Sequence, residues 1–169
     1  MVFVNESSLM VTWNDGKCLE VIQFPDMKIT TYAGLCKTLG ATYDTHRLDM
    51  RIGGPVGIAY DEKELIYASI IQSKIIVAIN VTSDIGMEFC STEDKPRYLS
   101  IDQLNGDIFL SMGGGFGVLR AENPEEGVVK LTGDGNGIGN FSNTKIQTGN
   151  GIVQMDREVW IMADYELHR

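Results

Sequence analysis

The chain is short of histidine, of basic residues and of long apolar runs, and each shortage disfavours a class of function. Its 169 residues contain two histidines, 14 Lys and Arg against 23 Asp and Glu, and carry a formal net charge of −9. Nucleic-acid binding normally needs clustered basic residues, and the basic residues here are scattered. No apolar stretch approaches the roughly 18 residues of a membrane helix. We therefore expect neither a nucleic-acid partner nor a membrane-spanning segment.

Cysteine is also scarce, and its three copies show no metal-binding spacing. Cys18, Cys36 and Cys90 include no C-x-x-C pair, so zinc or thioredoxin-type chemistry has no support. Segments 17–24 and 28–33 are typical of two strands joined by a tight turn, whose pairing would bring Cys18 near Cys36. We predict this disulfide in a secreted setting, with Cys90 buried or bonded elsewhere. Three reduced cysteines in a cytosolic protein are the alternative.

Three triplets match the N-x-[ST] glycosylation sequon, at Asn5, Asn80 and Asn140. All three fall in predicted turns or beside predicted loops. They favour an extracellular or cell-surface protein over a cytoplasmic one. Chance matches in a chain with many β turns are the other explanation.

Glycine and short β-type segments are abundant. Nineteen glycines against four prolines suit many tight turns. A strand that ends in an acidic turn and is followed at once by a second strand occurs at 53–68. Weaker copies occur at 98–111 and 151–162. The spacing of about 40–50 residues, with four strands in each unit, is typical of β-propeller blades.

The sequence therefore predicts an all-β fold, namely β-propeller blades of four-stranded antiparallel sheets in an incomplete ring of about three to four blades. Residues 1–169 form a single propeller segment in this interpretation. The blade-like units are expected at about 5–36, 52–91, 96–132 and 150–169, the last incomplete. No helical stripe competes, and an immunoglobulin-like sandwich does not predict a four-strand recurrence.

Two details of this organisation are expected from local patterns. The first unit reads as three strands within 8–33, with a turn at the Asn-Asp-Gly of 14–16. Residues 34–51 show no sustained period, and we expect a packed crossover between units or a functional loop.

The best-formed unit resembles the NHL repeat. Residues 29–34 are similar to the T-x-A-G strand end of that family, 54–61 to its P-x-G-I-A-x-D strand, and 65–68 to its second strand. Ser69 stands where the family has an Asp, and the likeness covers 29–80 well and the remainder weakly. The resemblance implies a propeller whose members mostly bind proteins or, in some branches, RNA. The acidic charge disfavours the RNA branch.

Few residues offer catalytic or metal-binding chemistry. Segment 134–140 resembles the start of a calcium loop but lacks the oxygen ligands that an EF-hand needs at its fifth and twelfth positions. Segment 112–117 is glycine-rich without the Gly-Lys-Ser/Thr triplet of a phosphate loop. His46 and His168 do not build a metal centre or a catalytic triad. We therefore predict no catalytic residue, no metal site and no cofactor.

Taken together, these patterns predict a non-enzymatic extracellular propeller segment that binds protein, in adhesion or structural assembly. Its partners would be other chains or the remaining blades of the same polypeptide, because closed propellers need about four to eight blades. The binding loops are expected at 34–51, with Asp44, His46 and Arg51, and at the glycine-rich turn with Phe116. The alternatives are part of a six-bladed hydrolase or lyase whose metal site lies on missing blades, and an intracellular NHL-type scaffold.

Overall fold

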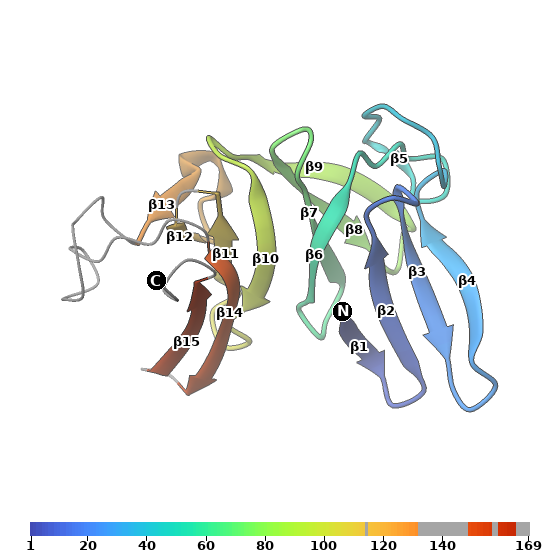
Figure 1. Cartoon of the computed structure of the whole chain (residues 1–169), viewed down its shortest axis with the longest axis horizontal. Helices are drawn as coiled ribbons and strands as arrows, with labels where there is room; N and C mark the ends of the chain where they lie inside the picture. The colour runs from blue at the N-terminus through green and yellow to red at the C-terminus, as the bar shows by residue number, and fades with distance from the viewer. Residues whose placement is uncertain (114, 132–148, 157–158, 165–169) are drawn as a thin grey trace.

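The described part of the chain folds into successive antiparallel β-sheets, and a longer connector at 34–54 joins the first two (Figure 1). A computed structural model describes residues 1–113, 115–131, 149–156 and 159–164, with side chains described in the first two ranges. These residues form β-strands and one short 3-10 turn, η1 (Pro124–Glu126), which confirms the all-β prediction. None of the described residues belongs to a helix long and apolar enough to cross a membrane.

Blade 1 is a meander of four strands that pair in sequence order, β1 (Val2–Asn5), β2 (Ser8–Trp13), β3 (Cys18–Gln23) and β4 (Lys28–Ala33). The sequence predicts three strands here, so β1 is a correction. Asn5 Oδ1 accepts hydrogen bonds from the amide and the hydroxyl of Ser7, both at 3.0 Å. These bonds close a tight turn that folds the short apolar segment β1 back onto β2.

Blade 2 is the central sheet, with the strands β6 (Pro55–Tyr60), β7 (Leu65–Ile70), β8 (Ile75–Asn80) and β9 (Ile85–Ser91). The two-residue strand β5 (Thr45–His46) of the connector pairs with β9 at its outer edge. Asp61 Oδ1 accepts three backbone amide hydrogen bonds at 2.8–2.9 Å in the β6–β7 turn. The acidic residue of the sequence pattern therefore closes the turn.

Blade 3 repeats the meander with β10 (Pro96–Ile101), β11 (Ile108–Met112), β12 (Gly115–Leu119) and β13 (Val128–Lys130). The fourth sheet has two described strands, β14 (Gly149–Asp156) and β15 (Val159–Asp164), and β14 contacts β10 and β11. The predicted loop at 134–140, including Asn140, lies outside the described residues, as does His168. The part of the chain that the structure describes does not close a ring.

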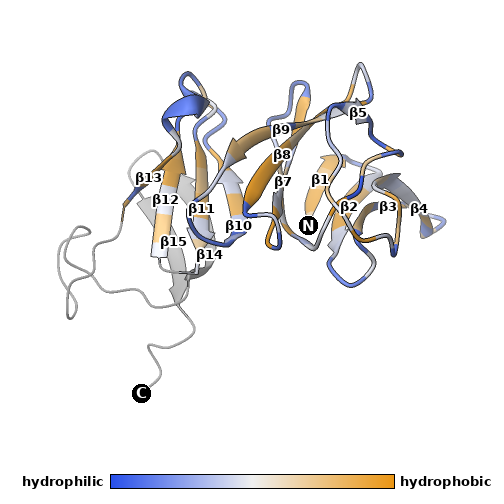
Figure 2. Cartoon of the chain, turned by 90° about the horizontal axis from the view of Figure 1, so that it is seen from above, coloured by the Kyte–Doolittle hydropathy of each residue, from blue (hydrophilic) through white to orange (hydrophobic). Residues whose placement is uncertain are grey.

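The sheets stand side by side in an open arc, with blade 1 at one end and the fourth sheet at the other (Figure 1). The first strand of each sheet contacts the sheet before it: β6 contacts β1 and β2, and β10 contacts β6 and β7. Figure 2 shows β7 and β8 as strongly hydrophobic strands between blades 1 and 3. The central blade is thus covered on both sides.

Alternation along β8 shows how the core is built. Ile75, Val77 and Ile79 belong to the apolar cluster shared with blade 1, whereas Ile76 and Ala78 belong to the cluster shared with blade 3. Successive side chains of a strand point to opposite faces, so a strand covered on both sides needs an unbroken apolar run. The central sheet therefore links two cores.

A hydroxyl from the second strand of each of the first two blades holds the next blade. Thr12 Oγ1 of β2 donates to the carbonyl of Val56 on β6 at 2.9 Å. Ser69 Oγ of β7 donates in the same way to the carbonyl of Arg97 on β10. Both carbonyl acceptors lie in the first strand of the next blade, at a point where that strand shifts register against the second strand. The blades are therefore joined by polar contacts as well as by apolar packing.

At the same register shifts, backbone amides donate hydrogen bonds to serine hydroxyls of their own blade. The amide of Gly57 donates to Ser69 Oγ at 2.8 Å, and the amide of Tyr98 donates to Ser111 Oγ at 3.0 Å. A bulge leaves an amide without a ladder partner, and the serine hydroxyl satisfies it. Ser69, which departs from the NHL pattern, thus connects its own blade with the next.

Cys18 and Cys36 form a disulfide, with their Cα atoms 5.0 Å apart, which confirms the predicted pairing. The register of β3 against β4 places Leu19 opposite Ala33, and this brings the two cysteines together. Cys90 is free and buried. The disulfide fixes the start of the connector to blade 1.

Candidate protein-binding surface

The clearest surface feature is the face of blade 1 that points away from blade 2, here called the outer face of blade 1. Cross-strand partners place four apolar residues in one row over all four strands: Phe3, Leu9, Ile22 and Ile29. Partners in a ladder share a face of the sheet. The row is therefore a continuous apolar band across the blade.

The side chains at both ends of the band are exposed to solvent, and so is a further apolar side chain at the end of β2. Phe3 is 62% exposed and Ile29 is 58% exposed, while Leu9 and Ile22 between them are half-buried. Trp13, 41% exposed, extends the outer face along β2, and its ring packs over Gly16. A monomeric sheet with a solvated face normally alternates apolar and polar residues.

The opposite face of the same sheet is a packed core. Met10 and Leu19 are fully buried against blade 2, and Val2 and Val4 pack beside them. Besides its packed inner face, blade 1 thus has an apolar band on a face that no described residue covers. Contiguous exposed apolar surface of this kind is typical of interaction sites.

Sequence reasoning missed this face, because it left β1 out and placed binding in loops. The signal was present in the sequence. Phe3 in β1, Leu9 and Val11 in β2, and Ile22 in β3 are apolar at alternating positions that cannot all belong to the inner core.

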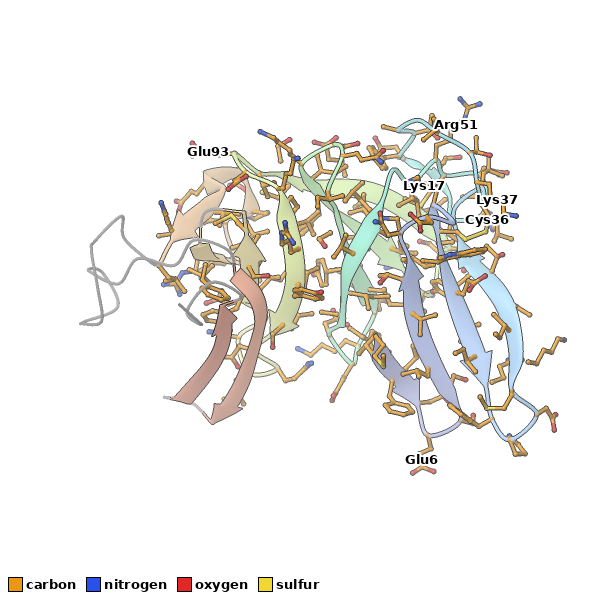
Figure 3. All side chains as sticks on the ribbon, in the orientation of Figure 1. Glu6, Lys17, Cys36, Lys37, Arg51 and Glu93 are labelled. Carbon is orange, nitrogen blue, oxygen red and sulfur yellow. A yellow bond between two sulfur atoms is a disulfide. The ribbon has the colours of Figure 1, made fainter. Side chains whose placement is uncertain are left out.

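The predicted binding-loop residues do not form one site. Asp44, His46 and Arg51 lie exposed on the connector, and Figure 3 shows Arg51 at the upper edge of the molecule. His46 Nδ1 accepts a hydrogen bond from the Leu48 amide at 3.3 Å, which makes it part of a local turn. Phe116 is fully buried in β12. The glycine-rich stretch is mostly strand, since β12 begins at Gly115, and it offers no exposed aromatic loop.

The connector is a packed crossover that Arg47 holds in place. Arg47 Nε donates to Asp84 Oδ1 at 2.6 Å, and its guanidinium also donates to the carbonyl of Tyr32 and lies 4.5 Å from the centre of the Tyr32 ring. These contacts join β4 of blade 1, the connector and the β8–β9 turn of blade 2. The connector is therefore a structural joint between two blades.

We expect Arg47→Ala to destabilise the protein by about 1–3 kcal/mol, because the Tyr32 carbonyl and ring lose their partner. Chemical denaturation measures the change. Arg51→Ala, in the same connector but at an exposed side chain, is the matched control and should change stability by less than about 0.5 kcal/mol. Equal stability of the two variants would contradict this role of Arg47.

The same ion pair sets an acid dependence. The hydrogen bond from Arg47 lowers the pKa of Asp84 below its ordinary value. A lowered pKa in the folded state contributes stability above the unfolded pKa, and that stability is lost as the pH falls through the folded pKa. The stability difference between wild type and Arg47→Ala should therefore narrow in acid.

A groove runs between β9 of blade 2 and the η1–β13 segment of blade 3. It contains a cavity of about 220 Å³ lined by Glu93, Asp94 and Glu126 among others, and an adjoining one of about 370 Å³ that reaches Cys90. Burial, and then the charge of Glu88, raise the pKa of the Cys90 thiol, which keeps it protonated and a poor nucleophile. Among residues with described side chains, no group of three or more His, Cys, Asp or Glu is placed to hold a metal ion.

Asn5 is exposed at the tip of the β1–β2 turn. We expect it to carry a glycan when the chain is made in a eukaryotic secretory pathway, because the sequon is accessible and lies in a turn. Intact mass before and after glycosidase treatment measures this, and Asn5→Gln is the control. A secreted chain with unmodified Asn5 would contradict the prediction. Asn80 is half-buried, and its Oδ1 accepts hydrogen bonds from the amides of Thr82 and Ser83.

Comparison with known proteins adds no identity to this geometry: no protein-family model and no curated protein matches the chain. The likeness to NHL repeats therefore stays a prediction.

Proposed function

We propose that this chain is a non-enzymatic, extracellular β-propeller segment that serves protein assembly, and that the outer face of blade 1 is its binding surface. The observation that carries the proposal is the apolar band from Phe3 to Ile29 across four strands, exposed at both ends.

The composition of the face suits a protein partner. Phe3 and Trp13 are large aromatic side chains with much exposed surface, and aromatic anchors supply a large share of binding energy at protein interfaces. Removing apolar surface from water contributes about 25 cal/mol per Å². A second apolar sheet laid on the band would bury it as blade 2 buries the inner face.

The disulfide supports the extracellular part of the proposal. Disulfides persist in oxidising compartments and are rare in the cytosol. Cys18–Cys36 also fixes the start of the connector to blade 1, so an oxidising compartment would keep this end of the arc rigid.

The test places a photoreactive phenylalanine analogue at position 3 of the full chain. After irradiation in extracellular fluid from its source, we expect covalent adducts with a polypeptide. The same analogue at Leu104, which is 67% exposed in the β10–β11 turn, is the matched control and should give few adducts. A Phe3 site that captures no polypeptide, or no more than the control, would overturn the proposal.

A further inference from the structure

At one end of the arc of sheets lies the outer face of blade 1. At the other end lies the fourth sheet, which contacts blade 3 through β14. Among the described ranges, no further sheet lies beyond it (Figure 1). The choice of partner for the outer face of blade 1 rests on the function proposed above.

The sequence of β15 is typical of a strand that is covered on both faces. Residues 159–163 read Val-Trp-Ile-Met-Ala, without a polar residue. The comparable run 75–79 in β8 is buried on both faces, between blades 1 and 3. A strand with one face in water would alternate instead. The sequence of β15 therefore favours a second neighbour for the fourth sheet besides blade 3.

We propose that the outer face of blade 1 binds the fourth sheet of a second copy of this chain, so that two copies join head to tail. The contact continues the packing already present within the chain. In each described junction, one blade lays an apolar face on the next, and the first strand of the later sheet contacts the earlier one. In the pair, the fourth sheet of one copy would precede blade 1 of the other, as each blade within the chain precedes the next.

The size of a blade face favours a closed pair over a single contact. Four strands spaced about 4.8 Å apart, each about six residues long, present a plan area of roughly 400 Å². Stable complexes bury about 800 Å² on each partner, so one such face falls short and two approach the requirement. Two copies related by a two-fold axis form two identical head-to-tail contacts. With four sheets in each copy, the pair stays within the roughly four to eight blades of closed propellers.

Charge gives the pair a distinctive salt response. Each copy has a formal net charge of −9, so two copies repel one another at low ionic strength. Salt screens this repulsion, whereas apolar contacts do not weaken with it. Self-association should therefore strengthen as salt is added.

The first measurement is light scattering on the full chain over a range of concentrations and salt. We expect a reversible dimer that increases with both. A mixture of isotopically light and heavy chains is then treated with a zero-length carbodiimide cross-linker. Mixed-isotope cross-links should join blade 1 of one copy to the fourth sheet of the other.

Variants test the face directly. The double change Phe3→Lys and Ile29→Lys puts charge on the band, and we expect self-association to weaken about tenfold or more. Leu104→Lys adds a charge at an exposed site away from the band and should leave it unchanged. Circular dichroism confirms that each variant is folded, and the cross-links of the wild-type chain do not depend on the variants.

Three results would overturn the inference: a monomer at all concentrations, dimers cross-linked from blade 1 to blade 1, or a chain whose Phe3 photoadducts never include a second copy. Adducts at Phe3 with another polypeptide would then leave the proposed function standing. Adducts with no polypeptide at all would remove both.

Discussion

Gly57→Ala is expected to destabilise the protein by more than about 3 kcal/mol, beyond the usual range for overpacking. A Cβ at position 57 would lie 2.0 Å from the carbonyl oxygen of Arg97 and 2.9 Å from the Cα of Tyr98. Both atoms belong to the backbone of β10, which cannot move without opening the junction between blades 2 and 3. Glycine is required here by the close approach of two backbones.

Chemical denaturation measures the loss, and Gly53→Ala is the matched control. A Cβ at position 53 would first meet the end of the Gln72 side chain, at 3.2 Å, and that flexible group can move. The control should cost under about 1 kcal/mol. If both variants unfolded at the same denaturant concentration, the backbone contact at Gly57 would not be the cause.

Phe116→Ala is expected to cost about 3–5 kcal/mol of unfolding free energy. Phe116 is the largest fully buried side chain among those that the structure describes, and its removal leaves a cavity. Domains of this size are stable by about 5–15 kcal/mol, so the variant should unfold at a clearly lower temperature. Thermal and denaturant unfolding both report the change.

Phe3→Ala is the matched control for Phe116→Ala, because it makes the same chemical change at a side chain that is 62% exposed. It should cost little stability and should weaken the self-association that light scattering measures. The opposite pattern, with a stable Phe116→Ala that loses binding, would restore the sequence-based view of Phe116 as a binding residue.

The sequence predicts most of the fold because local patterns decide it. Turn residues such as Asp61 mark where strands end. The unbroken apolar run of β8 marks a strand that is buried on both faces. The Cys18–Cys36 disulfide also follows from local pairing, since a hairpin brings the two cysteines together. These features depend on neighbours along the chain or on a single hairpin.

The candidate site could not be predicted in the same way. Whether Phe3 lies on the core face or the outer face depends on the register of β1 against β2 and on which side blade 2 packs. Phe116 shows the converse error, because glycines at 113–115 suggest a loop, while the pairing of β11 with β12 continues to Gly115. Both answers depend on contacts between strands that glycine and turn patterns do not specify.

The small strand β5 has a consequence for aggregation. An outermost strand exposes unpaired backbone groups that can recruit a strand from another molecule. Pairing of Thr45 and His46 with Gly86 and Ile85 occupies the start of that edge in the central blade. Because the disulfide and Arg47 both hold the connector, this cover is anchored to blade 1 as well. The crossover therefore protects the sheet on which both cores depend from edge-to-edge growth.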